Sequence, residues 1–178
     1  MKLDIGCGAS KKEGFIGVDI LQLNGVDIVH DLTAFPYPFE NNSVDEIWMD
    51  QVLEHLPNPL KVVEELYRIC KTNAKVTIGV PYFRSFYSVI DPTHVNFFGV
   101  YWFDYFDQSN AFAKKYKYCD VNFQINKIEF DREFKTEKIG FLKKKLIRFA
   151  ETKPHTYEAR LSHLLPLNSL TFHLEVIK

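Results

Sequence analysis

The first 80 residues alternate short apolar runs with turn-forming segments, and this order restricts the fold of the chain more than any other feature. The apolar runs are predicted strands, at residues 2–5, 15–20, 27–30, 44–49 and 74–80. A helical pattern precedes the last strand, because Asn58 is a good N-cap and Pro59 suits the first helical position. Its spacing predicts that Leu60, Val63 and Leu66 face the sheet. We therefore expect an α/β fold with an open, mostly parallel sheet.

The second half of the chain has a different pattern. Residues 83–106 are dense in aromatic side chains. Residues 121–125 and 170–176 alternate apolar with polar positions, which predicts an antiparallel pair of strands at the sheet edge. Residues 138–150 between them carry apolar side chains at helical spacing. The basic residues of segment 143–148 are expected to be the solvated face of this helix, or else a contact for an anionic substrate.

Composition fits one globular domain and excludes several classes of protein. The chain has 178 residues, 46% of them hydrophobic, and a net charge of -1 that gives no reason to expect nucleic-acid binding. Cys7, Cys70 and Cys119 are widely spaced and odd in number, as in a reduced, cytoplasmic protein. No apolar run approaches the roughly 18 residues of a membrane-spanning helix, so no membrane insertion is expected. No metal site is predicted.

No repeat or linker divides the chain. We therefore expect a single domain over residues 1–178. Residues 1–80 would form its cofactor-binding half, and residues 81–178 its substrate side with the edge strands. A monomer and a homodimer are both compatible with this organisation.

A glycine turn follows the first predicted strand. It consists of Gly6, Cys7 and Gly8, and it lies at the carboxyl edge of the sheet, where ligands of open α/β folds bind. Glycine lets a ligand approach the backbone closely. Asp19 ends the next predicted strand, where a carboxylate can accept hydrogen bonds from ribose hydroxyls. An ordinary turn and a solvated acid are alternatives for each alone, but together they favour a nucleoside-binding site.

The spacing of these residues disfavours NAD. Lys11 occupies the third glycine position of the dinucleotide motif G-x-G-x-x-G. Asp19 follows Gly8 by 11 residues, whereas that motif places its acid about 20 residues on. Only six residues separate Gly8 from Phe15, so the first crossover helix is expected to be shortened or absent. One side of the cofactor would then be open, unless a partner or the aromatic segment closes it.

Four motifs in order resemble those of class I S-adenosylmethionine (SAM)-dependent methyltransferases, most closely the small type 11 group. They are Asp4-x-Gly6-x-Gly8, residues 17–20, residues 30–32, and residues 44–47 leading into residues 52–56. The resemblance covers residues 2 to about 100 and weakens afterwards. It implies a Rossmann-like class I methyltransferase fold with an antiparallel edge hairpin, and SAM as the cofactor.

The resemblance also implies contacts with the methionyl and ribose parts of SAM. Asp4, Gly6, Cys7 and Gly8 match the turn that cradles the methionyl part. Asp19, with Ile20 beside it in the same motif, matches the acid that holds the ribose diol.

Two further segments match family positions. Asp31 and Leu32 match the pair beside the adenine ring, where a carboxylate accepts from the amine and an apolar side chain covers a ring face. Met49, Asp50 and Gln51 match the end of the fourth strand, near the sulfonium and the incoming acceptor. Acidic residues suit a cationic cofactor electrostatically.

Methyl transfer from a sulfonium is a direct displacement, so positioning of the acceptor is the main task and no protein nucleophile is needed. For a hydroxyl acceptor, a general base would contribute roughly 10²–10⁴-fold. His94, His55 and Asp50 are the candidates, with loop capping, turn anchoring and cofactor orientation as their alternative roles. We expect a SAM-dependent methyltransferase with a small-molecule or carbohydrate-like acceptor. A non-catalytic SAM- or nucleoside-binding module and an NAD-dependent Rossmann oxidoreductase are the alternatives.

Overall fold

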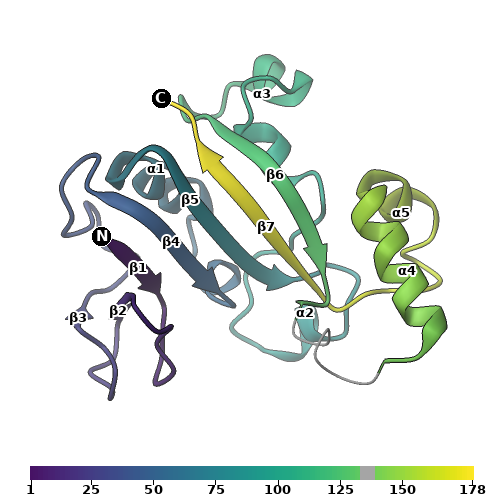
Figure 1. Cartoon of the computed structure of the whole chain (residues 1–178), viewed down its shortest axis with the longest axis horizontal. Helices are drawn as coiled ribbons and strands as arrows, with labels where there is room; N and C mark the ends of the chain where they lie inside the picture. Colours follow the sequence, from purple (N-terminus) through teal and green to yellow (C-terminus); the bar gives the residue numbers. More distant parts are fainter. Residues whose placement is uncertain (133–138) are drawn as a thin grey trace.

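The computed structural model describes residues 1–132 and 139–178, and these contain a seven-stranded sheet (Figure 1). The strands are β1 (Lys2–Ile5), β2 (Ile16–Asp19), β3 (Ile28–Val29), β4 (Val44–Asp50), β5 (Cys70–Pro81), β6 (Phe123–Phe130) and β7 (Ser169–Val176). Their order across the sheet is β3-β2-β1-β4-β5-β7-β6. Strands β1 to β5 pair in parallel, whereas β7 is antiparallel to both β5 and β6. The predicted mostly parallel sheet with an antiparallel edge is therefore confirmed.

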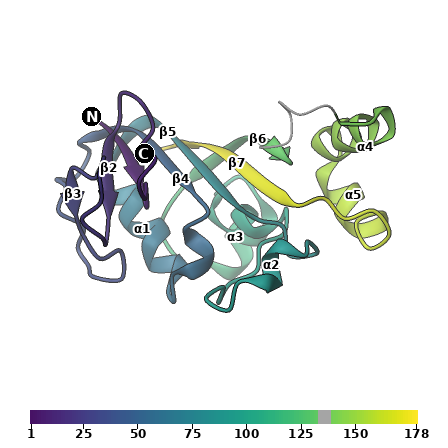
Figure 2. The same ribbon diagram turned by 90° about the horizontal axis from the view of Figure 1, so that it is seen from below.

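Three of the helices lie on the same side of this sheet, as Figure 2 shows: α1 (Pro59–Ile69), α2 (Tyr87–Ile90) and α3 (Ala111–Tyr116). Helices α4 (Phe141–Thr152) and α5 (Pro154–Arg160) lie together beyond the ends of β6 and β7 (Figure 1). Two short 3-10 helices are η1 (Leu53–His55) and η2 (Trp102–Phe106). Predicted residue Lys138 of the helix at 138–150 lies outside the described residues. No helix of the described chain is long and apolar enough to cross a membrane.

Helix α1 begins where the sequence predicts. The Asn58 side chain accepts a hydrogen bond from the backbone N–H of Lys61 at 3.2 Å, which confirms it as the N-cap. The prediction for Leu60 is wrong, since this side chain is 40% exposed. Leu60 lies in the first turn and points away from the sheet, because the buried residues of α1 lie on the opposite side of the helix. The buried residues of α1 are Val62, Val63, Leu66 and Ile69.

One face of the sheet is apolar. Directly paired residues project from the same face, and one such row crosses five strands. It consists of Ile5, Met49, Ile78, Phe172 and Ile128, all of them buried. Full burial of a side chain of this size contributes about 1.5–3 kcal/mol. This face therefore supplies much of the core.

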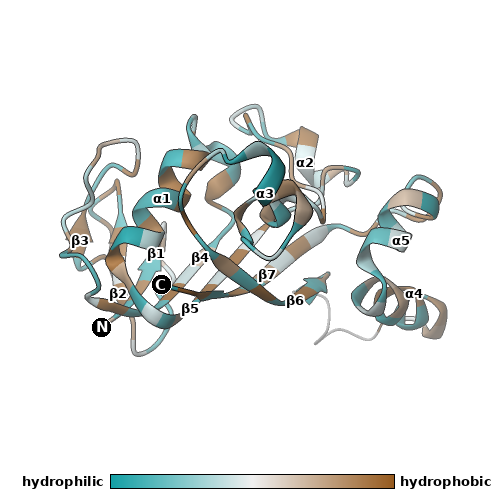
Figure 3. Cartoon of the chain, turned by 90° about the horizontal axis from the view of Figure 1, so that it is seen from above, coloured by the Kyte–Doolittle hydropathy of each residue, from teal (hydrophilic) through white to brown (hydrophobic). Residues whose placement is uncertain are grey.

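The opposite face is polar. A second row of paired residues consists of Lys2, Glu46, Lys75 and Glu175, so charges of opposite sign alternate from strand to strand. Lys2 and Glu46 form an ion pair at 2.7 Å. Opposite charges directly across a sheet stabilise it by about 0.2–1 kcal/mol per pair. Hydrophilic and hydrophobic segments accordingly alternate along the strands (Figure 3), and the polar face can meet water without a covering helix.

The connection between β1 and β2 explains why this face is open. Residues 6–15 form turns and contain no helix, as the short spacing predicts. A crossover helix there would cover a face of the sheet. The loop is fixed instead by side chains, since Asp4 accepts from the backbone N–H of Lys12 at 2.7 Å and Lys11 pairs with Asp27 at 2.7 Å.

Asp131 joins three elements at the far end of the sheet. Its carboxylate is fully buried and accepts from the backbone N–H groups of Asn168 and Ser169, at the start of β7. Lys143 of α4 pairs with the same carboxylate at 2.8 Å. Asp131 itself follows β6 and has a positive φ of 48°. This single side chain therefore positions α4 relative to β6 and β7.

Replacement of Asp131 by alanine is expected to lower the free energy of unfolding by about 3 kcal/mol, because two backbone N–H groups lose this acceptor and the Lys143 ammonium loses this ion pair. The measurement is the urea midpoint followed by circular dichroism. The exposed Asp120→Ala serves as the matched control and should unfold like wild type. Equal midpoints for the two variants would contradict the anchoring role of Asp131.

Candidate functional site

A cavity of about 300 Å³ lies at the carboxyl ends of the parallel strands. The chain connections reverse direction between β1 and β4, which is where open α/β sheets bind ligands. The cavity is lined by Gly6, Asp19, Ile20, Asp31, Leu32, Thr33, Gln51, Val52, His55 and Leu56. The glycine turn after β1, Asp19 at the end of β2 and Asp31 after β3 therefore converge on one cavity.

Gly6 is required by the close approach of the turn to Val52. Its φ is +70°, and a Cβ at this position would lie 2.3 Å from Cγ2 of Val52. Gly8 does not line the cavity, but its backbone N–H donates to Oδ2 of Asp19 at 2.9 Å. This hydrogen bond ties the glycine turn to the end of β2.

Asp19 points both its oxygens at backbone donors and still has capacity for a ligand. Oδ2 accepts from Gly8, and Oδ1 accepts from the backbone N–H of Leu21 at 3.0 Å. A carboxylate offers about four lone-pair positions, so each oxygen keeps one. A vicinal diol in the cavity could donate to both.

Asp31 is held in a tight turn. Its Oδ1 accepts from the backbone N–H of Thr33 at 2.8 Å and from the Thr33 hydroxyl at 2.7 Å. These two hydrogen bonds lower the pKa of Asp31. Among the described residues only Oδ1 is engaged, so Oδ2 can accept from a ligand. Leu32 beside it is buried and offers an apolar surface to the cavity.

Several residues predicted to bind the cofactor lie outside the lining of this cavity. Asp4 is buried on the polar face of the sheet, and burial raises its pKa. Its hydrogen bond to Lys12 shapes the loop instead. Met49 is buried on the apolar face, 1% exposed. Cys7 is buried, and its Sγ would lie 2.8 Å from a Cβ at Gly17.

Asp50 also lies outside the lining, on the polar face, where it forms an ion pair with Arg132 at 2.6 Å. The side chain crosses over Gly79 of β5, where a Cβ would come within 1.9 Å of Oδ1. The Arg132 guanidinium in turn lies 4.4 Å from the ring centre of Trp48, and Lys12 Nζ lies 3.5 Å from that ring. Arg132 and Trp48 are residues that the sequence did not single out.

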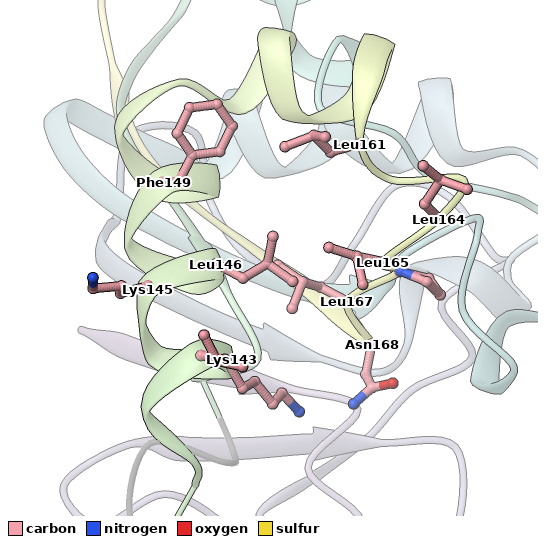
Figure 4. A pocket seen from close by; sticks show the side chains of 11 residues that line it. Lys143, Lys145, Leu146, Phe149, Leu161, Leu164, Leu165, Leu167 and Asn168 are labelled. Carbon is pink, nitrogen blue, oxygen red and sulfur yellow. The ribbon is translucent and has the colours of Figure 1, made fainter.

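Two further cavities share lining residues with the first or with each other. A second cavity of about 300 Å³ shares Gln51 with it and is lined also by Asp50, Pro81, Tyr87, Arg132, Asn168 and Ser169. A third, of about 730 Å³, shares Asn168 with the second. Figure 4 shows leucine side chains from both of its walls directed into this third cavity, which is mostly apolar.

The predicted histidines lie together at the edge of the first cavity. The backbone carbonyl of Glu54 accepts from the N–H groups of Val95 at 2.9 Å and Asn96 at 3.2 Å, which joins the loop after α2 to η1. The rings of His55 and His94 are consequently 4.7 Å apart, centre to centre. Only His55 of the two lines the cavity.

Glu54 is the residue of this cluster that sequence reasoning missed as a functional candidate. It is 1% exposed, and neither carboxylate oxygen has a hydrogen-bond partner among the described residues. Its Oε1 lies 4.0 Å from Nε2 of His94. Burial raises the pKa of Glu54 to about 8. In the sequence, the position of Glu54 next to His55 in a predicted motif was the signal that could have identified it. The burial of Glu54, however, depends on residues about 40 positions later in the chain.

Comparisons with known proteins agree with the fold. Residues 3–78 match the family model described as a methyltransferase domain. A demethylmenaquinone methyltransferase of Oceanobacillus iheyensis is 39% identical over 56 residues, which are 32% of this chain and 23% of that enzyme. The chain therefore matches about a quarter of the length of this curated relative.

Solved structures cover nearly the whole chain. A SAM-dependent methyltransferase from Archaeoglobus fulgidus superposes with a TM-score of 0.54 at 23% identity, over 98% of this chain and 85% of that one. A phosphoethanolamine N-methyltransferase of Haemonchus contortus, in complex with S-adenosylhomocysteine, gives 0.52 at 18% identity over 99% of this chain and 48% of that one. Residues 3–78 thus resemble the methyltransferase domain family, and the described chain has the class I methyltransferase fold.

Proposed function

We propose that this protein is a SAM-dependent methyltransferase with a small-molecule or carbohydrate-like acceptor. The observation that carries the proposal is the convergence of Gly6, Asp19 and Asp31 on one cavity at the switch point of the sheet. The family match over residues 3–78 supports it independently. When bound, the cofactor supplies a methyl group on a positively charged sulfur.

The residues present fit the nucleoside part of SAM. Asp19 keeps a free lone pair on each oxygen, which suits a ribose diol. Oδ2 of Asp31 can accept from the exocyclic amine of adenine, and Leu32 can cover a ring face. Two carboxylates near a cationic ligand also favour its binding electrostatically.

The acceptor would enter through the second cavity, which shares Gln51 with the first. Its lining includes Tyr87 and Asn168, which can hydrogen-bond to a polar acceptor. Of the candidate bases, His55 lines the first cavity and Asp50 lines the second, and the two cavities share Gln51. We propose that Asp50 orients the acceptor through Arg132, and that the cluster of His55 and His94 assists removal of the proton when the acceptor is a hydroxyl.

The alternatives differ in measurable ways. NAD is disfavoured because residues 6–15 contain no helix, so no helix N-terminus faces the glycine turn to bind a pyrophosphate. Calorimetric titration with SAM, S-adenosylhomocysteine and NAD separates the cases. Tighter binding of NAD would overturn the proposal. A screen of acceptor classes that follows release of S-adenosylhomocysteine would then show turnover, and SAM binding without turnover of any acceptor would favour a binding module.

Replacement of Asp19 by alanine is expected to weaken S-adenosylhomocysteine binding by about 1–3 kcal/mol, because the ribose donors and the Gly8 N–H lose their acceptor. Calorimetry gives the affinity directly. Asp19→Asn should lie between wild type and Asp19→Ala, since one amide oxygen remains. Affinity unchanged from that of the exposed control Asp120→Ala would remove Asp19 from the ribose role.

Replacement of Gly6 by alanine is expected to weaken the same ligand by at least about tenfold, because the added Cβ overlaps Val52 and the positive φ disfavours a side chain. Val52 would have to move into the cavity that it lines. Gly140→Ala is the control, since its Cβ would meet nothing within 4 Å and its φ is −61°. Equal binding by both variants would argue against a ligand at this turn.

A further inference from the structure

We propose that Glu54, His55 and His94 bind one divalent transition-metal ion, with Zn²⁺ as the best match. One nitrogen of each imidazole and one carboxylate oxygen all lie within 4.8 Å of one another. Spacing along the chain does not indicate a metal site, because His94 is distant from Glu54 and His55 in the sequence. Three features of the cluster support the proposal. They are the tautomer of His94, the tautomer of His55, and the burial of Glu54 without a hydrogen-bond partner among the described residues.

The surroundings of His94 determine which ring nitrogen carries its proton. Nδ1 lies 3.2 Å from the backbone carbonyl oxygen of Ser88. A carbonyl oxygen only accepts, so Nδ1 must be the donor. The lone pair of the neutral ring is therefore on Nε2, the atom that lies 4.0 Å from Oε1 of Glu54.

A similar argument, which includes one more hydrogen bond, shows which ring nitrogen of His55 carries the proton. The Thr93 hydroxyl donates to Oδ1 of Asp91 at 2.6 Å. Its oxygen can then only accept from Nδ1 of His55, which lies 2.8 Å away. This places the lone pair of His55 on Nε2. Metal-binding histidines are typically held in this way, with the second ring nitrogen donating to a carbonyl or to a carboxylate-linked group.

Glu54 supplies the independent observation. A carboxylate that is 1% exposed and has no hydrogen-bond partner among the described residues is costly to bury. The 4.0 Å between Oε1 and Nε2 of His94 is too long for a hydrogen bond. It is close to the ligand-to-ligand separation of roughly 3.4 Å in a tetrahedral site with bonds of about 2.1 Å. A cation between these atoms would satisfy the carboxylate with small side-chain movements.

The ligand set selects the class of metal. Two imidazole nitrogens and one carboxylate oxygen suit Zn²⁺ and related first-row ions, whereas Mg²⁺ prefers oxygen ligands alone. Three protein ligands leave a coordination position open. His55 lines the first cavity, so an acceptor oxygen or nitrogen could take that position. Only this last step rests on the proposed methyltransferase activity.

The test uses the untagged full chain, treated with a chelator and dialysed, then titrated with ZnCl₂ by calorimetry and with CoCl₂ by visible absorption. Wild type should bind one ion per chain. His94→Ala and Glu54→Gln should weaken Zn²⁺ binding by at least about 100-fold, and Thr93→Val, which only orients His55, by about tenfold. The control His163→Ala removes an exposed histidine outside the cluster and should bind like wild type.

Absence of stoichiometric Zn²⁺ binding by wild type would overturn the proposal, and so would an equal loss in His163→Ala and His94→Ala. Should either ligand variant fail to fold, Thr93→Val and the ligand-field bands of Co²⁺ in wild type still decide between the outcomes. Binding of S-adenosylhomocysteine is measured on the same samples. Wild type that binds this ligand but no metal would refute the metal site alone, and metal binding without it would refute the methyltransferase proposal alone.

Discussion

The structure depends on a short connection. The loop between β1 and β2 is too short for a full crossover helix, so one face of a largely parallel sheet has no helix from this segment. Parallel strands are usually apolar on both sides because helices cover both faces. Here the strands alternate instead, and the row Lys2, Glu46, Lys75 and Glu175 brings opposite charges together on the open side. Helices α1, α2 and α3 pack on the other side, where the core lies (Figure 2). Trp48 is a large apolar side chain on the polar face, and the cations of Lys12 and Arg132 cover its ring.

The same constraint changes how the glycine turn is held. In a doubly wound fold the helix that follows the turn fixes its shape. In this chain, carboxylates replace that helix: Asp4 accepts from Lys12 within the loop, and Asp19 accepts from Gly8 in the turn. Asp19 therefore makes structural hydrogen bonds and still has, on each oxygen, a lone pair that faces no donor among the described residues. Asp4, by contrast, is buried on the polar face and outside the lining of the cavity.

Local patterns predicted much of the fold. The positions of most strands, the Asn58 N-cap, the missing helix after the glycine turn and the antiparallel edge depend on spacing within a few residues, and the structure confirms them. Two predicted strand bounds are wrong, since β5 begins at Cys70 rather than at residue 74 and β6 spans Phe123–Phe130 rather than residues 121–125. Of the residues predicted to bind the cofactor, Gly6, Asp19, Ile20, Asp31, Leu32 and Gln51 line one cavity, although their roles remain predictions. The direction of Asp50 was not predictable, because it depends on Gly79 in the neighbouring strand, which leaves room for its side chain. The burial of Glu54 depends on a loop 40 residues later, through hydrogen bonds that no local pattern reveals.

The side chains that line the cavities differ in charge from one end of the site to the other. Asp19 and Asp31 make the first cavity acidic, which suits a cationic ligand, while the third cavity is lined mainly by leucines. Two buried or half-buried acids near these cavities differ in whether a cation pairs with them. On one side Asp50 and Arg132 neutralise each other as an ion pair. On the other side Glu54 has no such partner among the described residues, although it is the more buried of the two acids.

A buried acid without a partner is retained at a cost to stability, and costs of this kind are concentrated where proteins bind ligands or perform chemistry. We therefore expect the side of Glu54 to bind the proton or cation that the chemistry of the acceptor requires, while Asp50 and Arg132 orient the acceptor.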